Sequence, residues 1–460
     1  MDQRDALHPK HLINRLVLCS VLLPGLSGMA AQAQQSLALR QAIDQALEQS
    51  PDAVIAHAGS AEARAGATQA RTQLLPQMNF TEDISRGNDP VYVFGTKLRQ
   101  QQFTQADFAP NALNRPLPIG NFATRFSGQW LAFDSFKTQR TIHSADLLRR
   151  SADSRANAVN QKIVLDVVEA YQAVLYAERE ISVAQHEQET AEALLNSVND
   201  RVKAGLAVES DRMAAEVNIA ARKQDLIAAQ GDRELAWAQL RLAMGAPDLA
   251  ESQLAPIGPH KFPESSLEQE LATAAKMRPD MNALAEEQGA QAAAVGAAKS
   301  DFGPRVSAYG AWEQDRATFA GSGGNNWVAG AEISIDILPL SKRAQLAREN
   351  AAKLRIDAQV TAFRQRVQLE VSRAHIERQT AQLQVATAQA AMEQAAESLR
   401  ILRNRYAAGL ATITDLLRAE DAERQSQTSY WHAVYGNALA YAGELFAAGM
   451  LTADAAEELQ

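Results

Sequence analysis

Two long runs of the chain carry a helical pattern with no glycine or proline to interrupt it. They cover residues 137–200 and 341–404. Apolar residues in the first run follow one another at the three-, four- and seven-residue steps of a coiled coil. They are Val164, Val167, Tyr171, Val174 and Ile181. At 1.5 Å per residue, each run predicts a helix on the order of 95 Å long, and such helices must pack along one another.

Four shorter segments alternate apolar and polar residues instead. The clearest is 325–338, and residues 122–134 follow it closely, while 304–313 and 77–86 alternate more weakly. About ten alternating residues with aromatics near the ends are typical of a transmembrane β-strand, and a half-exposed soluble sheet is the alternative. We expect lipid contact on one face of 325–338, with Ser334 and Asp336 on the other. The lipid-facing residues are Trp327, Ile333, Ile335 and Ile337.

Four strands are too few to close a membrane barrel. A lipid-facing sheet can have no open edge, because each unsatisfied backbone group in hydrocarbon costs several kcal/mol. Closed membrane barrels begin at about eight strands, more than one chain supplies. Two or more chains must therefore pool their strands, and three chains would give twelve. The pattern predicts an oligomer in contact with outer-membrane lipid.

The same order of elements occurs twice along the sequence. The phrase RVKAGLAVESDRMAAE begins at residue 201, and RYAAGLATITDLLRAE begins at residue 405. Prolines also recur at matching places, Pro51 with Pro279 and Pro76 with Pro304. We therefore predict two repeats, residues 34–245 and 264–450, each reading helix, strand, loop, strand, very long helix, glycine phrase and helix. In this scheme Pro76 and Pro304 mark the helix–strand junctions.

The remaining segments connect and flank the repeats. A helix is expected before the strands of each repeat, at 37–75 and at 264–300. Residues 246–263 contain four prolines and form the linker between the repeats. The tail 451–460 is acidic and alanine-rich, and we expect it to be poorly ordered.

The glycine in each repeated phrase predicts a reversal of the chain. Gly205 and Gly409 follow long helices, and glycine adopts the left-handed conformation of a helix end without steric cost. Asp211 and Asp415 lie six residues further on, in the first turn of the returning helix, where a carboxylate suits the positive helix terminus. Two interpretations stay open for these aspartates, support of the helix terminus and a role in gating or docking.

Taken together, the two phrases and the paired prolines resemble the TolC family of outer-membrane efflux and secretion channels, from about Leu37 to Met450. The strongest marker is the second phrase, with Arg405, Tyr406, Gly409, Asp415, Leu416 and Leu417; the first phrase matches less fully, with Arg201, Gly205 and Asp211. The resemblance implies a homotrimer, mainly α-helical, with a shared twelve-stranded β-barrel and a long periplasmic α-helical barrel. It also implies an aperture that docks on a periplasmic adaptor fed by an inner-membrane pump.

One departure from the family concerns the second tip. In the best-known members, charged residues near this tip form rings and links that hold the aperture shut. Here Ala411 and Arg418 stand at the matching positions beyond Asp415. The resemblance therefore predicts a docking and aperture region around both tips, including Arg418, but a different latch for the closed state.

The connection between the first two strands is unusually long. Residues 86–121 fill it, whereas the second repeat uses a short loop around GSGGNN. Its apolar residues include Tyr92, Phe94, Phe103 and Phe108, too many for a solvated tether. Long loops of outer-membrane barrels are extracellular. We expect three copies to fold inward over the barrel mouth; packing on the rim of the same chain's barrel is the alternative.

Residues 1–33 have the pattern of a secretory signal peptide. Arg4, Lys10 and Arg15 precede an apolar run, and Ala31-Gln32-Ala33 predicts cleavage near Ala33. The only cysteine, Cys19, leaves with this segment. A transmembrane anchor and a lipoprotein at Cys19 fit the pattern less well. We expect an outer-membrane protein with a long periplasmic extension.

Composition and motifs exclude several other classes. A net charge of −9 without a basic cluster argues against nucleic-acid binding. The eight histidines form no HExxH or paired ligand spacing, so we expect no catalytic residues, no metal and no cofactor. The favoured function is the exit channel of a tripartite efflux system for small molecules. Alternatives are the outer-membrane component of type I protein secretion and a soluble periplasmic coiled-coil scaffold.

Overall fold

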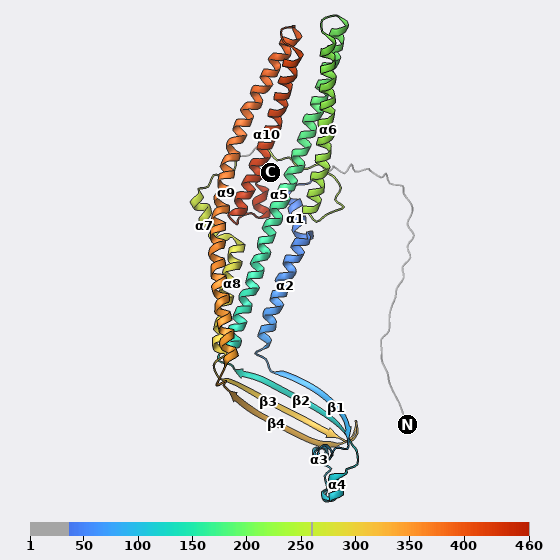
Figure 1. The fold of residues 1–460 in the computed structure, drawn as a ribbon, viewed down its shortest axis with the longest axis vertical. Helices are drawn as coiled ribbons and strands as arrows, with labels where there is room; N and C mark the ends of the chain where they lie inside the picture. Colours follow the sequence, from blue (N-terminus) through green and yellow to red (C-terminus); the bar gives the residue numbers. More distant parts are fainter. Residues whose placement is uncertain (1–35, 259–260, 460) are drawn as a thin grey trace, which may run out of the picture.

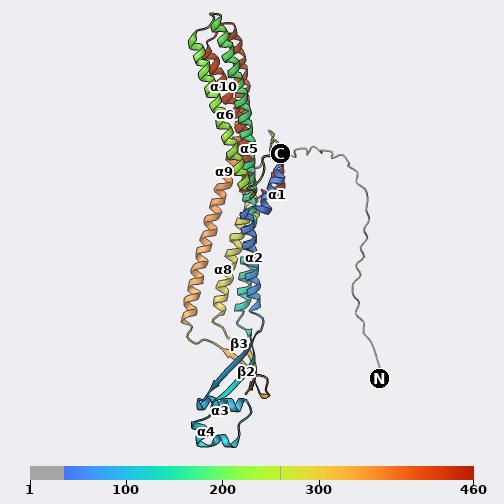
Figure 2. The ribbon, with the colours of Figure 1, turned by 90° about the vertical axis from the view of Figure 1, so that its right-hand side faces the viewer.

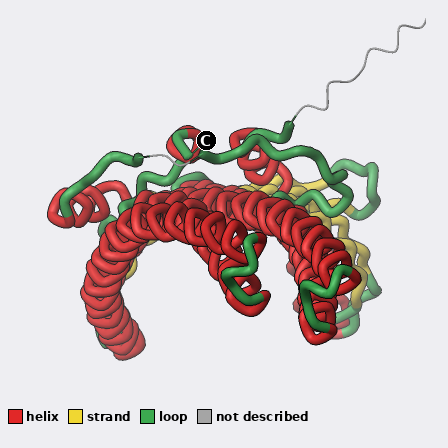
Figure 3. Tube along the Cα trace, turned by 90° about the horizontal axis from the view of Figure 1, so that it is seen from above, coloured by secondary structure: helices red, strands yellow, loops and turns green. Residues whose placement is uncertain are grey.

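The structure, a computed structural model, describes residues 36–258 and 261–459. The predicted signal peptide lies outside the described residues. The described chain is elongated, with long helices at one end, a four-stranded sheet toward the other end and a small helical cap beyond the sheet (Figure 1). Seen along its long axis, the helical part forms a curved layer (Figure 3).

The two uninterrupted runs form the two longest helices, as predicted. Helix α5 (Lys137–Lys203) has 67 residues and α9 (Leu340–Ala407) has 68. Each turns back into a helix of 35 residues, α6 (Glu209–Ala243) and α10 (Ile413–Ala447). The hairpins α5–α6 and α9–α10 project together beyond the rest of the chain (Figure 2). In the described part of the chain, no helix combines the length and the apolar character needed to cross a membrane.

The coiled-coil spacing in α5 marks its buried face. Val164, Val167, Tyr171 and Val174 are buried, and Ile181 is partly buried. The four buried residues belong to the largest hydrophobic core, which also receives residues from α1, α6 and α10. Trp237 of α6 and Leu240 are fully buried in it. Burial of these side chains along the length of α5 holds the molecule together at its middle.

The helix predicted before each pair of strands is in fact two helices. Residues 37–75 form α1 (Leu39–Gln49) and α2 (Pro51–Thr72), and residues 264–300 form α7 (Leu267–Met277) and α8 (Pro279–Ser300). A proline cannot continue a helix, because it lacks the N–H and its ring clashes with the preceding turn, but it suits the first helical position. Ser50, just before Pro51, is extended and caps α2 by accepting a hydrogen bond from Ala53 N at 3.2 Å.

The four alternating segments form one antiparallel sheet in the order β1-β2-β3-β4. The strands are β1 (Gln77–Gly87), β2 (Ile119–Phe133), β3 (Arg305–Arg316) and β4 (Gly323–Ser334). Strand β4 ends at Ser334, so the prediction that Ile335 and Ile337 lie within the strand is wrong. Residues 335–338 form no strand and lead to Pro339, the N-cap of α9.

The linker and the tail both contribute to the core. In the linker, Leu254 and Ile257 are buried, and Leu254 forms a parallel bridge with Leu37. The expectation of a poorly ordered tail is wrong: it contains α11 (Ala453–Glu457). Leu451 and Leu459 are fully buried in the main core. These apolar side chains fix the tail despite its acidic composition, because their burial outweighs the solvation of the charged residues between them.

Candidate functional site

The two hairpin tips are built alike, around a left-handed glycine. Gly205 and Gly409 both have φ of +74°. At the second tip, Gly409 N donates to the carbonyl of Tyr406 at 3.0 Å and Leu410 N to that of Arg405 at 2.8 Å. The first tip has the equivalent pair of bonds. This pattern is a Schellman motif, in which the last carbonyls of a helix are satisfied by the turn. The predicted helix reversals are confirmed.

The two aspartates cap the returning helices, but unequally. Asp415 Oδ2 accepts hydrogen bonds from Thr412 N at 3.1 Å and Thr412 Oγ1 at 2.7 Å. The threonine hydroxyl in turn accepts from Asp415 N at 3.2 Å, which completes a capping box. These bonds, led by the one from the Thr412 side chain, lower the pKa of Asp415. Asp211 accepts only from Val208 N, at 3.5 Å. Both residues therefore lie at a helix terminus, with a full capping box only at Asp415, and a role in gating or docking stays a prediction.

The tips of the two hairpins contact each other. Arg201 of α5 donates to the carbonyl of Tyr406 of α9 at 3.0 Å, and its guanidinium lies 4.8 Å from the centre of the Tyr406 ring. Below this contact, Val198 of α5 and Leu416 of α10 are buried in a separate hydrophobic cluster. Arg201 of the first phrase and Tyr406 of the second thus act together, because they join one hairpin to the other.

Ala411 and Arg418, the two positions at which the second tip departs from the family, lie at one shallow pocket. Arg405, Ala411, Asp415 and Arg418 line it, with an open volume of about 400 Å³. Arg405 also donates to the carbonyl of Leu410 at 3.4 Å. Both arginines are exposed, and their positive charges contribute to the lowered pKa of Asp415. The pocket therefore presents two cations beside one carboxylate rather than a ring of acidic groups.

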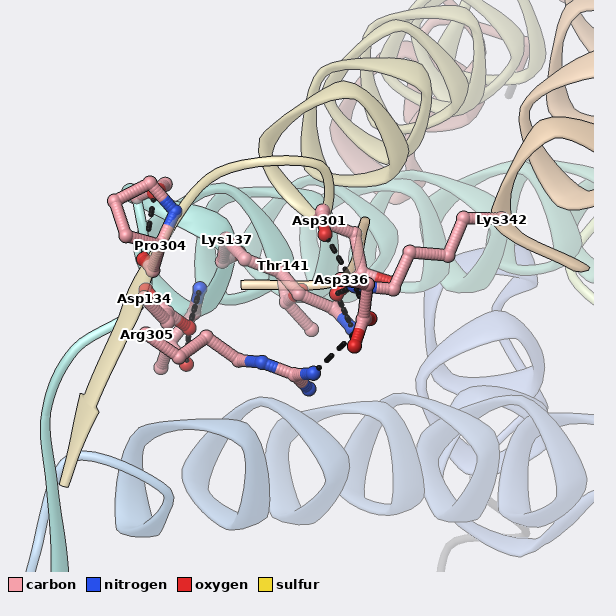
Figure 4. Close-up of polar contacts among 10 residues, drawn as sticks. Asp134, Lys137, Thr141, Asp301, Pro304, Arg305, Asp336 and Lys342 are labelled. Atoms are coloured by element: carbon pink, nitrogen blue, oxygen red, sulfur yellow. Dashed lines mark hydrogen bonds and ion pairs between the residues drawn. The ribbon is translucent and has the colours of Figure 1, made fainter. Parts of the chain in front are cut away.

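A network of ion pairs joins the helices to the sheet (Figure 4). Asp301, just after α8, pairs with Lys137 at 2.8 Å, and its carbonyl accepts from Lys342 at 2.5 Å. Lys342 also pairs with Asp336 at 2.5 Å, and Arg305 approaches the same carboxylate at 3.3 Å. The ion pair with Lys342 is the main cause of the lowered pKa of Asp336. The network links the start of α5, the start of α9, the start of β3 and the segment that follows β4.

The turn from β2 into α5 is locally strained. Ser135 and Phe136 have φ of +59° and +67°, which is unfavourable for residues with a side chain. The turn is held by Ser135 Oγ, which donates to the carbonyl of Pro304 at 2.8 Å, and by Asp134, which accepts from Thr138 N at 2.8 Å. Pro304 directly precedes β3, as predicted for a helix–strand junction (Figure 4).

Pro76 occupies the equivalent place before β1. Helix α2 ends at Thr72, and the next residues form a turn whose Leu74 carbonyl accepts a hydrogen bond from Trp130 Nε1 at 2.9 Å. The indole of β2 thus holds the first junction, whereas ion pairs hold the second.

One face of the sheet carries a row of aromatic side chains across all four strands. Phe80 lies opposite Phe126, Phe126 opposite Trp312, and Trp312 opposite Trp327. The exposed fractions are 61% for Phe80 and 79% for Trp327. Ile333, on the same face of β4, is 75% exposed. A continuous exposed aromatic row on one sheet face indicates a surface made for an apolar environment.

The opposite face of the sheet is polar. Near one end, Asn121 donates to Asp315 at 2.7 Å, and Asn326 donates to the second oxygen of Asp315 at 3.2 Å. Arg125 pairs with Glu313 at 2.7 Å. Asp315 is fully buried. The two faces therefore differ: one carries the aromatic row, with the Glu82–Arg316 ion pair near its cap end, and the other is hydrogen-bonded and polar.

The long connection between β1 and β2 folds into a cap. It contains α3 (Pro90–Arg99), the short 3₁₀ helix η1 (Gln105–Phe108) and α4 (Pro110–Asn114). Phe94, Phe103 and Phe108 pack edge to face, with ring centres 4.7 and 5.2 Å apart. Tyr92 OH lies 2.9 Å from Ser85 Oγ of β1. Three aromatics of this segment therefore form a cluster, in which Phe108 remains exposed.

The cap is attached to the end of its own sheet. Gln100 is buried and donates to the Gly120 carbonyl and to Asn121 Oδ1, both at 2.9 Å. Asn326 of β4 donates to the carbonyl of Arg99 at 3.3 Å. These contacts support packing on the rim of the same sheet, while one chain leaves the prediction of inward folding over a shared mouth untested.

One cluster of ionisable residues was missed by the sequence analysis. Glu270, His375 and Glu444 come from α7, α9 and α10, and their ligand atoms lie within 4.8 Å of one another. No short motif could have revealed them, because they are more than 60 positions apart in sequence. Burial and the nearby Glu270 raise the pKa of Glu444.

Comparison with known proteins places the chain among outer-membrane proteins. A family model described as outer membrane efflux protein matches residues 42–246 and 271–440. No curated protein matches the chain.

Solved structures show the same fold at low identity. The CmeC outer membrane channel of Campylobacter jejuni has a TM-score of 0.77 and 18% identity, covering 90% of this chain and 85% of CmeC. The open MtrE outer membrane channel of Neisseria gonorrhoeae has a TM-score of 0.73 and 21% identity, with 90% and 89% covered. VceC of Vibrio cholerae, an outer membrane protein, has a TM-score of 0.74 and 19% identity, with 89% and 96% covered.

Proposed function

Because this chain belongs to the outer membrane efflux protein family, we propose that it is the outer-membrane exit channel of a tripartite efflux system. In this function a periplasmic adaptor and an inner-membrane pump deliver small-molecule substrates to the aperture between the hairpin tips. The substrates then leave through the helical and sheet parts to the exterior.

The observation that carries this proposal is the two-sided sheet. Its exposed face bears the aromatic row of Phe80, Phe126, Trp312 and Trp327, and its other face bears hydrogen-bonded polar residues. This arrangement suits a strand wall between lipid and a water-filled lumen. A soluble periplasmic scaffold would have no use for such a face, because exposed aromatics in water favour aggregation.

The sheet also supports a homotrimer. Strands β1 and β4 are the two edges, and neither edge pairs with another strand in the described chain. Unpaired backbone groups in hydrocarbon cost several kcal/mol each, so a lipid-facing sheet must be closed. Three chains joined β4 to β1 give a twelve-stranded barrel, and the curved layer of helices in Figure 3 is the matching arc of a helical barrel.

The hairpin tips are the proposed docking surface for the adaptor. Each tip exposes a leucine directly after its glycine, Leu206 at 72% and Leu410 at 69% exposed. The capped turns hold these leucines at the end of the molecule. Exposed apolar side chains on a rigid turn fit a protein partner better than they fit water.

The test begins with the protein itself. We expect it in the outer-membrane fraction, as a heat-modifiable trimer by light scattering in detergent that conducts ions across planar bilayers. A soluble monomer without conductance would refute the channel. Docking is tested separately with Leu206→Asp/Leu410→Asp, which should reduce drug efflux in cells while trimer mass and conductance stay unchanged. Normal efflux by this variant would place the adaptor elsewhere.

A further inference from the structure

A buried polar cluster lies where three helices meet, far from both tips and the sheet. His375 Nδ1 of α9 is 2.8 Å from Glu270 Oε1 of α7 and 3.7 Å from Glu444 Oε1 of α10. Glu270 is 3% exposed and Glu444 is 6% exposed. Two carboxylates and an imidazole are thus held together in a place where water cannot surround them, and burying such charges is costly unless they are compensated.

Neighbouring residues orient these groups. Arg378 Nε lies 3.8 Å from Glu444 Oε2, so the arginine faces one oxygen while the other faces His375. Gln379 lies 2.9 Å from His375 Nε2, which leaves Nδ1 directed at the two glutamates. Glu270 Oε1 also accepts from Ser265 Oγ at 2.5 Å, whereas Glu270 Oε2 is buried and, with both glutamates ionised, has no hydrogen-bond partner among the described residues. An acceptor atom without a partner, inside such a cluster, is available to a ligand.

The cluster borders a cavity. Its volume is about 570 Å³, and its lining includes His375, Glu444, Arg378 and Ser265. Water in this space can reach the cluster. The cavity also gives an ion a path from the solvent to His375 and Glu444, and Glu270 lies directly behind His375, with Oε1 2.8 Å from Nδ1.

The equivalent place in the first repeat carries no carboxylate and no imidazole. The shift of 228 residues that relates Pro51 to Pro279 places Ala42 at the position of Glu270. The shift of 204 that relates Gly205 to Gly409 places Tyr171 and Leu240 at the positions of His375 and Glu444. All three first-repeat residues are fully buried in the main hydrophobic core. Ala42 and Leu240 are apolar, and the Tyr171 hydroxyl bonds the backbone carbonyls of Leu37 and Ala255. The fold therefore needs no carboxylate or imidazole at this place, and the charged set of the second repeat calls for another explanation.

We infer that Glu270, His375 and Glu444 form a binding site for one divalent transition-metal ion of the zinc class. One imidazole nitrogen and two carboxylate oxygens are ligands that Zn²⁺ accepts, and a cavity water completes four-coordination. The ion's charge compensates both buried carboxylates. The ring Nε2 then carries the proton and donates a hydrogen bond to the amide oxygen of Gln379, after rotation of the amide. The ion ties the short helix α7 to the hairpin α9–α10.

The test uses the intact trimer in detergent, stripped with a chelator and titrated with Zn²⁺ alone. We expect about one tightly bound ion per chain by calorimetry and elemental analysis, and a higher melting temperature with the ion. His375→Gln should lower the affinity about 100-fold and remove the thermal shift, and Gln379→Ala should lower it about tenfold. His432→Gln, another helical histidine outside the cluster, should bind as the unaltered protein does.

Two results would overturn the site. One is a stripped protein that takes up no stoichiometric zinc; the other is His375→Gln binding zinc as the unaltered protein does. If His375→Gln fails to assemble, Co²⁺ titration of the unaltered trimer decides instead. Visible d–d bands that Zn²⁺ then abolishes support the site, and their absence overturns it. None of these measurements depends on efflux, so they remain informative whether or not the channel function holds.

Discussion

Four glycines share a left-handed backbone conformation but differ in how closely other atoms surround them. Gly205 and Gly409 at the tips, and Gly245 and Gly449 at the ends of the returning helices, all have positive φ. A Cβ at either tip glycine would meet no atom within 4 Å, whereas at Gly245 it would lie 2.7 Å from Ser50 Cα and at Gly449 2.7 Å from Arg278 Cα. The tip glycines are therefore needed for conformation alone, and the other two for close packing as well.

This difference predicts a ranking of substitutions. Gly409→Val should cost roughly 1 to 2 kcal/mol of local stability from backbone strain, and should impair adaptor coupling more than trimer assembly. Gly449→Ala should cost more despite its smaller side chain, because backbone atoms must move. Gly436→Ala, inside α10 with open space around it, is the control and should be neutral or stabilising. Heat-modifiability of the trimer and an efflux assay measure the two effects; unchanged efflux in Gly409→Val would count against the role of the tip.

The capping box at the second tip predicts a pH dependence. The folded-state pKa of Asp415 is lowered, so its contribution to stability is complete above the unfolded-state pKa of about 3.9 and is lost as pH falls through the lower folded-state value. Amide hydrogen exchange at the tip should accelerate in that acid range beyond the intrinsic rate. Thr412→Val, which copies Val208 of the first tip, should weaken this response. Equal pH profiles for the unaltered protein and Thr412→Val would show that the hydrogen bond from the Thr412 hydroxyl does not set the response.

At the scale of elements, periodicity predicted the long helices and the four strands because each pattern repeats over many residues. The division at Ser50 was missed, since an alanine-rich helical pattern continues on both sides of it and only Pro51 marks the break. The order of the tail was missed because Leu459 is buried against helices distant in sequence. The cluster of Glu270, His375 and Glu444 depends on the same kind of contact, which a one-dimensional pattern does not contain.

Strand β4 allows a test of which face meets lipid. The end of the strand at Ser334 moves the informative positions to its middle, where Ala329 shares the face of Trp327 and Val328 points to the other side. Ala329→Arg should cost about 2 to 4 kcal/mol if it lies near the bilayer midplane. Val328→Arg, one residue away, should be much milder because its face borders the lumen. Yields of folded trimer in the outer membrane compare the two; equal yields would mean that the assignment of faces is wrong.

Across the whole molecule, the two repeats form the same framework and differ in two features, the cap and the buried polar cluster. Both supply a helix pair, two strands and a long hairpin, and the hairpins are joined through Arg201 and Tyr406. The first repeat alone has the cap between its strands, and the second alone has the buried polar cluster. Duplication therefore accounts for the wall of the channel. The cap and the polar cluster, which are not duplicated, are the features that can control the exit and the stability.

The effect of the cap on the exit depends on how the chains assemble. It is attached to its own sheet through Gln100 and Asn326, but Phe108 is 62% and Leu117 86% exposed, which leaves apolar surface for contact with other copies. If three caps meet at the axis, deletion of residues 88–115 should leave the trimer intact and raise single-channel conductance. Lys97→Ala, which breaks the 2.6 Å ion pair with Asp107 inside the cap but keeps its attachment, should change conductance much less. A deletion variant that conducts as the unaltered protein does would place the cap on the rim, clear of the exit.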